Sequence, residues 1–161
     1  MLDYFKRPNL ANLPVFVIRG NHDSYFDWTE ELQLTMTQCQ WELPSFYYTK
    51  LVPSGQNGEL MGILFIDSVL MLCSDYTSAQ LEKTPLHDEE LIRLRAIACG
   101  DPTWVTWGNT QYSWILKTMQ EWDQNPNIIW KVAVQHYPMF PLHYPMSDYM
   151  QIVNYLLPIL Q

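Results

Sequence analysis

The apolar positions along the chain form short runs typical of strands and longer stripes typical of helices. Residues 14–18 are a short apolar run that stops at Gly20, which predicts a strand buried on both faces and then a tight loop. Residues 128–134 are a second apolar run, and it stops at His136 in the same way. The sequence therefore predicts two buried strands that each release polar side chains at their C-terminal ends.

Two further β-rich runs flank a strong turn signal. Residues 46–52 and 60–66 are separated by a polar segment that contains Asn57-Gly58, a pair that favours a hairpin. An antiparallel pair is expected there. The apolar stretch Val69 to Cys73 is expected to extend the second strand, and residues 74–107, interrupted by prolines and a glycine, are expected to run over the surface.

Helices are predicted where apolar residues recur at three-to-four-residue steps. Asn109 or Thr110 is expected to cap the most regular helix, which Asn125-Pro126 ends. Pro158 falls where the last helix should continue. The other predicted helices cover residues 27–40, 87–98 and 149–157.

Composition places the chain among globular proteins and removes two classes of partner. The 161 residues are 48% hydrophobic and 16% charged, which fits one domain with one core. The formal charge of −8 repels nucleic acid and gives no basic patch for anionic lipid, and no apolar run approaches the length that spans a bilayer. We therefore expect neither nucleic acid nor a membrane as partner. Three cysteines cannot all pair within one chain, so they do not decide the redox compartment.

The polar residues after the two predicted strands are candidates for a site. Open α/β sheets build their sites in the crevice beyond the strand ends, so Asn21, His22 and His136 are expected to be neighbours. An Asn carbonyl oxygen and a neutral His nitrogen are acceptable ligands for a first-row metal ion, and both leave its positive charge largely uncompensated. Such a charge is what a bound phosphate needs.

These motifs resemble a known family. Residues 13–23, which end in Gly-Asn-His-Asp, are similar to the Gly-Asn-His-Asp/Glu block of metallophosphoesterases. The His-Tyr-Pro at residues 136–138 resembles the Gly-His-Tyr-Pro block of purple (tartrate-resistant) acid phosphatases in particular. Three more blocks are similar to that family in order and spacing, so the resemblance spans about Leu13 to Leu160. They are residues 41–48, 65–68 and 111–115.

The resemblance implies a fold, a chemistry and roles for individual residues. The fold would be a partial α/β metallophosphoesterase sandwich with mixed β-sheets flanked by helices, in which residues 1–161 form the central portion of a single calcineurin-like domain. The activity would be hydrolysis of small-molecule phosphate monoesters at two metal ions, iron with a second iron, zinc or manganese. Asn21 and His136 would ligate one ion, His22 would be a hydrogen-bond donor or general acid, and His143 would be a second phosphate-facing histidine. Family members are commonly secreted or lysosomal.

Departures from the family pattern limit these expectations. The family also has Asp-x-Gly and Gly-Asp-x-x-Tyr before the Asn block and Gly-His-x-His after the last helix, and this sequence contains none of them. Two ligands do not hold a catalytic metal ion by themselves. We therefore expect a central fragment that lacks phosphatase activity when made alone and that is poorly soluble, because its truncated sheets expose apolar surface. Gln135 also replaces the Gly that usually precedes the ligand histidine.

Other interpretations stay open at this stage. The chain is alternatively a non-catalytic remnant or binding module of the same fold, or part of a phosphodiesterase or nucleotidase of the same superfamily. The Gly-Asn-His-Asp segment alone is also compatible with an ordinary turn. Asp23 and Asp67 are expected to be structural rather than metal ligands.

Overall fold

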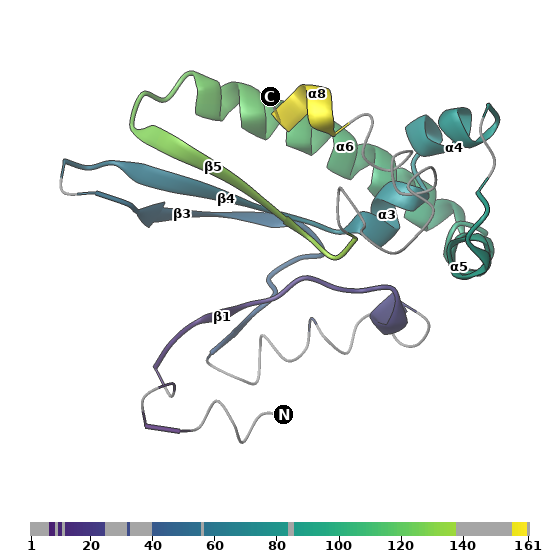
Figure 1. Cartoon of the computed structure of the whole chain (residues 1–161), viewed down its shortest axis with the longest axis horizontal. Helices are drawn as coiled ribbons and strands as arrows, with labels where there is room; N and C mark the ends of the chain where they lie inside the picture. Colours follow the sequence, from purple (N-terminus) through teal and green to yellow (C-terminus); the bar gives the residue numbers. More distant parts are fainter. Residues whose placement is uncertain are drawn as a thin grey trace.

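The computed structural model describes residues 7, 8, 10, 12–24, 32, 40–55, 57–83, 86–137 and 156–160. Its elements confirm an α/β fold, with a two-stranded sheet, a three-stranded sheet and helices that pack around them (Figure 1). The predicted helix over residues 27–40 lies almost wholly outside the described residues, as does most of the one over residues 149–157. The last described element is the short helix α8 (Leu157–Leu160), which includes Pro158 in its first turn, where proline is tolerated.

The three-stranded sheet has the order β3–β4–β5. The predicted hairpin is confirmed: β3 (Tyr48–Pro53) and β4 (Leu60–Ile66) are antiparallel, with Tyr48 opposite Phe65. Gly58 in the connecting turn has a φ of 78°, a conformation that glycine adopts without strain. β5 (Ile128–Gln135) then joins β4 in parallel.

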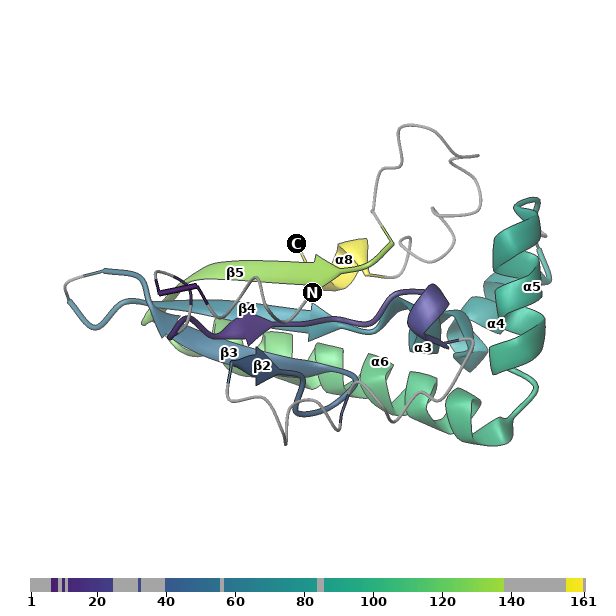
Figure 2. The ribbon, with the colours of Figure 1, turned by 90° about the horizontal axis from the view of Figure 1, so that it is seen from below.

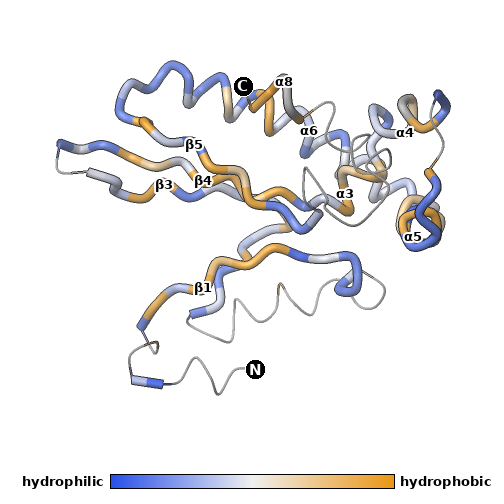
Figure 3. Tube along the Cα trace, in the orientation of Figure 1, coloured by the Kyte–Doolittle hydropathy of each residue, from blue (hydrophilic) through white to orange (hydrophobic). Residues whose placement is uncertain are grey.

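The apolar run after β4 is a helix, so the predicted extension of that strand is wrong. Asp67 caps α3 (Ser68–Leu72) because its Oδ1 accepts hydrogen bonds from the backbone N–H groups of Val69 at 2.9 Å and Leu70 at 3.0 Å. Every residue of α3 is buried, and a short run that is apolar on all sides does not distinguish a buried strand from a buried helix. Figure 3 shows this apolar path running along β4 and into α3.

The described residues between 74 and 107 form helices that contribute side chains to the core, which corrects the prediction of a surface excursion. They form α4 (Asp75–Leu81), α5 (Glu89–Ala98) and the start of α6 (Pro102–Asp123). The disulfide Cys73–Cys99 ties the end of α5 to the end of α3; Cys39 lies outside the described residues. The core residues from this segment are Leu91, Leu94, Ala98 and Trp104.

α6 begins earlier than the sequence suggested. Its N-cap is Asp101, whose carboxylate accepts a hydrogen bond from the backbone N–H of Thr103 at 2.8 Å, with proline next in the first turn. Asn109, the predicted cap, instead pairs with Asp75 at the start of α4. The C-terminal end, before Asn125-Pro126, is as predicted. α6 covers one face of the three-stranded sheet (Figure 1). None of the described helices is long and apolar enough to cross a membrane.

A second layer lies on the other face of that sheet (Figures 1 and 2). It consists of β1 (Val15–Phe16) paired in parallel with β2 (Trp41–Glu42). The strand predicted over residues 14–18 is therefore shorter than expected, and it is half-buried rather than buried on both faces. The layer packs on the sheet through Phe65, which stacks on Tyr48 at 4.4 Å between ring centroids and contacts Phe16 at 5.8 Å.

β5 is also less buried than predicted. In the described part of the chain it pairs with β4 alone, and the middle of the strand is open to solvent. The exposed fractions are 48% for Ile129, 62% for Trp130 and 38% for Val132. The apolar run predicted the position of this strand correctly. It did not predict the exposure of the strand, because exposure depends on which other elements cover it.

Candidate functional site

The turn after the β1 layer is closed by its own side chains. The Asp23 carboxylate accepts a hydrogen bond from the Gly20 N–H at 2.7 Å, and the Ser24 hydroxyl donates to the Gly20 carbonyl at 3.1 Å. The short 3₁₀ helix His22–Ser24 follows directly. Asp23 therefore has a structural role within its own turn, as expected. The turn therefore has a defined shape that leaves the side chains of Asn21 and His22 available for other contacts.

A buried ion pair anchors this turn to the rest of the chain. Nε of Arg19 donates to Oδ2 of Asp67 at 2.8 Å, a second nitrogen of the guanidinium reaches the same oxygen, and both side chains have an exposed fraction of 0%. The guanidinium also lies 3.9 Å from the centre of the Phe46 ring. Gln111 of α6 bonds both the N–H and the carbonyl of Asp67, at 2.8 and 2.9 Å. Asp67 is thus structural, as predicted, and it holds the turn against α3 and α6.

The structure brings Asn21 and His136 together, although 115 residues separate them in the sequence. Nε2 of His136 lies 2.8 Å from Oδ1 of Asn21. The imidazole also packs against Gly20, where a Cβ atom would lie 2.9 Å from its Cε1. The backbone N–H of Tyr137 donates to the Ser68 hydroxyl at 3.4 Å, which attaches the end of β5 to α3. The expected proximity of the two strand ends is therefore observed, and Gln135 in place of glycine does not prevent it.

Glu90 is a site residue that the sequence analysis missed. The Asn21 amide nitrogen donates to Oε1 of Glu90, and Nε2 of His22 lies 3.6 Å from the same oxygen. Glu90 follows the N-cap of α5, where acidic residues are common because they complement the helix dipole. That local explanation is complete without a site. Only the packing of α5 beside the turn shows that this carboxylate faces Asn21 and His22.

His22 is largely open to solvent. Its side chain is 81% exposed, and that of Glu90 is 47% exposed. The cleft beside it has a volume of about 430 Å³ and is lined by His22, Glu89, Glu90 and Arg93. An exposed imidazole at a cleft is accessible to a ligand from solvent. His143, the other predicted phosphate-facing histidine, lies outside the described residues.

Oδ1 of Asn21 and Nε2 of His136 have the chemistry and the separation of two ligands of a metal ion. A carbonyl oxygen and an imidazole nitrogen 2.8 Å apart have about the separation of two neighbouring ligands on a first-row ion, roughly 3 Å for bonds of about 2.1 Å. Among the described residues there is no group of three or more His, Cys, Asp or Glu side chains that could hold an ion. Asn21 and His136 therefore fit as two ligands, and the described part of the chain does not complete the set.

Comparison with known proteins gives distant relatives of one kind. No protein-family model matches the chain. It is similar to tartrate-resistant acid phosphatase type 5 of Sus scrofa, with 25% identity over 163 residues, which cover 98% of this chain and 40% of that protein. It is also similar to the protein of the same name from Mus musculus, with 31% identity over 85 residues, 52% of this chain and 26% of that protein. The chain thus spans less than half the length of these curated relatives, and it is distantly related to acid phosphatases.

Proposed function

We propose that this chain forms part of the active site of an acid-phosphatase-type hydrolase that cleaves phosphate monoesters at a dinuclear metal centre. The observation that carries the proposal is the contact between Asn21 and His136, because it joins the ends of two distant strand regions through two neutral ligand atoms. The distant similarity to tartrate-resistant acid phosphatases supports the same chemistry. A small-molecule phosphate ester is the proposed substrate.

Asn21 and His136 are proposed as two ligands of one of the two ions, which by resemblance are iron with a second iron, zinc or manganese. When bound, such a pair of ions supplies positive charge for phosphoryl oxygens and lowers the pKa of a bound water. Because both side chains are neutral ligands, they would leave that positive charge largely available to the substrate. The contact of Asn21 with Glu90 fixes the amide so that its oxygen, rather than its nitrogen, faces His136.

His22 is proposed as the proton donor to the leaving group. It is next to Asn21 in sequence, it is open to solvent, and its Nε2 is close enough to the Glu90 carboxylate for an ion pair when the imidazole is protonated. His143 remains a proposed second phosphate-facing residue. The cleft lined by His22, Glu89, Glu90 and Arg93 would receive the leaving group.

The proposal treats residues 1–161 as one part of a single catalytic domain. The exposed side chains of Trp130 and Val132 support this, because apolar surface of that kind is normally covered by another layer of the same domain. Two ligands do not hold a catalytic ion alone. The 161-residue chain by itself is therefore expected to show no phosphatase activity.

Hydrolysis of p-nitrophenyl phosphate by the complete gene product that contains this sequence, loaded with iron and zinc, tests the proposal. We expect activity that falls about a hundredfold or more in Asn21→Ala and in His136→Ala. Asn109→Ala is the matched control, because Asn109 makes a comparable amide–carboxylate contact with Asp75 away from the site.

Each outcome of this experiment decides between the interpretations. A folded, metal-loaded gene product that hydrolyses no phosphate ester would favour a non-catalytic remnant of the fold. Faster cleavage of bis(p-nitrophenyl) phosphate than of the monoester would favour a phosphodiesterase. Sustained turnover by the 161-residue chain alone would contradict the proposed incompleteness of the site.

A further inference from the structure

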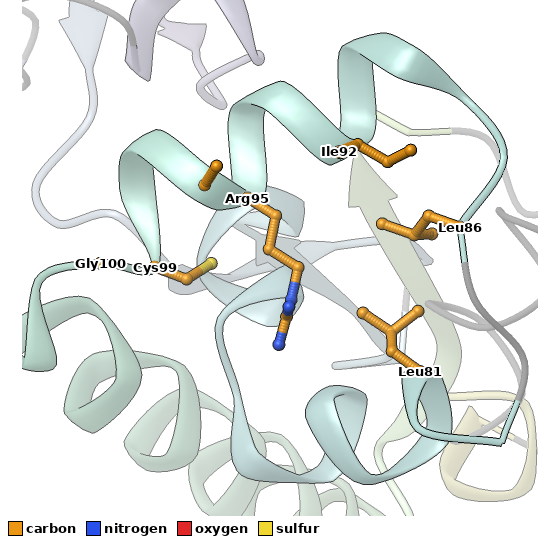
Figure 4. Close-up of a pocket in the computed structure, with 7 residues that line it drawn as sticks. Leu81, Leu86, Ile92, Arg95, Cys99 and Gly100 are labelled. Carbon is orange, nitrogen blue, oxygen red and sulfur yellow. The ribbon is translucent and has the colours of Figure 1, made fainter.

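A second cavity lies between α4 and α5 and shares no lining residue with the cleft beside His22 (Figure 4). Its volume is about 550 Å³, within the range of roughly 300–1,000 Å³ that is usual for small-molecule sites. Apolar side chains form part of its wall, and Arg95 contributes the one charged side chain among the lining residues. These are Leu81, Leu86, Ile92, Arg95, Ala96, Cys99 and Gly100.

Arg95 projects from α5 into this cavity, between the apolar side chains and towards α4 (Figure 4). One terminal nitrogen of its guanidinium donates to the Ser78 hydroxyl at 2.8 Å. Its Nε is buried and has no hydrogen-bond partner within the described residues. A buried N–H group that bonds neither protein nor ligand costs free energy, so this nitrogen favours an acceptor that enters the cavity.

No carboxylate partner of Arg95 is found among the described residues, although the chain is acidic. The sequence has 17 acidic and 9 basic residues, and four other described cations have carboxylate partners. The pairs are Arg19–Asp67, Lys50–Glu42, Lys117–Glu121 and Lys131–Asp123. In the described part of the chain, Arg95 has a neutral hydroxyl as its side-chain partner instead. The cavity therefore presents a positive charge that matches an anion.

The frame of the cavity is held in place on both sides. The Cys73–Cys99 disulfide fixes the C-terminal end of α5, and the backbone N–H of Cys99 donates to the Arg95 carbonyl at 2.8 Å. Leu91 and Leu94, on the other face of α5, are fully buried in the core. Ile92, by contrast, is 47% exposed at the cavity, so a ligand that covers it removes apolar surface from water. A preformed cavity of this kind loses little entropy when it binds.

We propose that this cavity is a binding site for a small amphipathic anion, an alkyl carboxylate whose head group bonds Arg95 and whose chain lies along Leu81, Leu86 and Ile92. The planar guanidinium matches the two oxygens of a carboxylate, and the apolar wall matches an alkyl chain. This inference does not depend on the proposed phosphatase activity, because the cavity and the Asn21–His136 contact share no residue.

Calorimetric titration of the complete gene product that contains this sequence with octanoate tests the proposal, with octan-1-ol and acetate as matched ligands that each lack one half of the interaction. We expect saturable binding of one octanoate, at least about tenfold tighter than either control, since each tenfold step corresponds to the loss of one such interaction. Absence of saturable octanoate binding, or equal affinity for octan-1-ol, would overturn the proposal.

Two kinds of variant locate the binding. Arg95→Met keeps the apolar stem but removes the charge, and we expect it to weaken octanoate binding about tenfold or more. Ile92→Gln should also weaken binding, whereas Ile97→Gln should not, because Ile97 is similarly exposed (50%) on the same helix but does not line the cavity. If Arg95→Met does not fold, the Ile92 and Ile97 pair decides the matter. Equal octanoate affinity in those two variants, or unchanged affinity in folded Arg95→Met, would contradict the assignment.

Discussion

The turn that follows β1 makes two junctions with the rest of the molecule, and they differ in burial and in the number of partners. At the first, Arg19 and Asp67 are fully buried and Asp67 also bonds Gln111 and the backbone of α3. At the second, two residues further on, Asn21 meets an exposed His136 through one contact. At the first junction both carboxylate oxygens of Asp67 are bonded within the protein, and Nη1 of Arg19 is buried without a partner among the described residues. At the second, a buried Asn21 and an exposed His136 bring two ligand atoms face to face, as a binding site requires.

This difference indicates a division of roles within one short segment. The buried pair fixes the position of the turn, so the polar residues after it are held in place without strong interactions of their own. Mutations at the first junction should therefore affect stability, whereas mutations at the second should affect binding. The following predictions test that division, from the largest expected change in stability to the smallest.

Asp67→Asn should cost about 3–5 kcal/mol of unfolding free energy, because it leaves the Arg19 charge buried without a carboxylate. Asparagine keeps the capping interaction with α3, since it is as good an N-cap as aspartate. Asp88→Asn, at the N-cap of α5, is the matched control and should change stability by less than about 0.5 kcal/mol. Urea denaturation of both variants checks this, and equal losses would show that the ion pair contributes little.

Tyr48→Phe should cost about 1–3 kcal/mol, because the Tyr48 hydroxyl accepts from the Val17 N–H at 3.0 Å and faces the carbonyls of Val17 and Glu42 at 2.8 and 2.9 Å. This hydroxyl joins the β1–β2 layer to β3. Tyr47→Phe, at the neighbouring residue whose ring packs on Trp114, is the control and should change stability far less.

The same hydroxyl predicts a dependence of stability on pH. Burial raises the pKa of Tyr48 from 10.0 to about 12, with the nearby Glu42 charge adding to the rise and the Val17 hydrogen bond opposing it. The folded state therefore holds this proton more tightly than the unfolded state, so the contribution is complete below pH 10 and is lost as pH rises towards 12. Stability measured from pH 9 to 12 should fall less steeply in Tyr48→Phe than in the parent chain. Parallel curves would contradict the prediction.

Gly20→Ala should change stability by about 1 kcal/mol, because the exposed His136 ring can move away from the added methyl group. Its effect on metal binding should be larger, since the displaced ring no longer faces Asn21, and we expect about tenfold weaker Mn²⁺ binding by the complete gene product that contains this sequence. Gly100→Ala, where the nearest atom is a backbone oxygen at 3.4 Å, should leave Mn²⁺ affinity unchanged. Equal Mn²⁺ affinity in the two variants would show that the space at Gly20 is not needed for metal binding.

Asn21→Ala should have a similarly small effect on stability, about 0.5–1.5 kcal/mol, because it removes part-buried hydrogen bonds. Asn109→Ala removes a similar amide–carboxylate contact and should cost about as much. A loss above about 3 kcal/mol for Asn21→Ala, measured by urea denaturation, would place Asn21 with the buried junction rather than the binding one.

The parts of the fold that follow from local chemistry could be predicted from the sequence. Asn57-Gly58 fixed the hairpin, Asn125-Pro126 marked the end of α6, and the two strand ends predicted that Asn21 and His136 meet. The start of α6 was missed because the glycine and proline on either side of Asp101 indicate a break, although proline in the first turn of a helix is favourable.

The remaining features depend on tertiary packing, which no local pattern encodes. α3 has the same apolar composition as a buried strand, and only the Asp67 cap and the surrounding core make it helical. Glu90 reaches Asn21 because α5 packs beside the turn. Trp130 is exposed because the described residues place nothing over it. The disulfide partner of Cys73 could not be chosen from three cysteines without the positions of α3 and α5.

Titration of the complete gene product that contains this sequence with Mn²⁺, followed by NMR of the Asn21 side-chain amide and the His136 imidazole, tests the central claim most directly. If the two residues are ligands of one ion, both signals should broaden together and saturably, while the Asn109 amide stays sharp, and Asn21→Ala should weaken the broadening of His136. Broadening that is confined to acidic surface residues, or broadening of His136 that is unchanged in Asn21→Ala, would contradict a shared metal site.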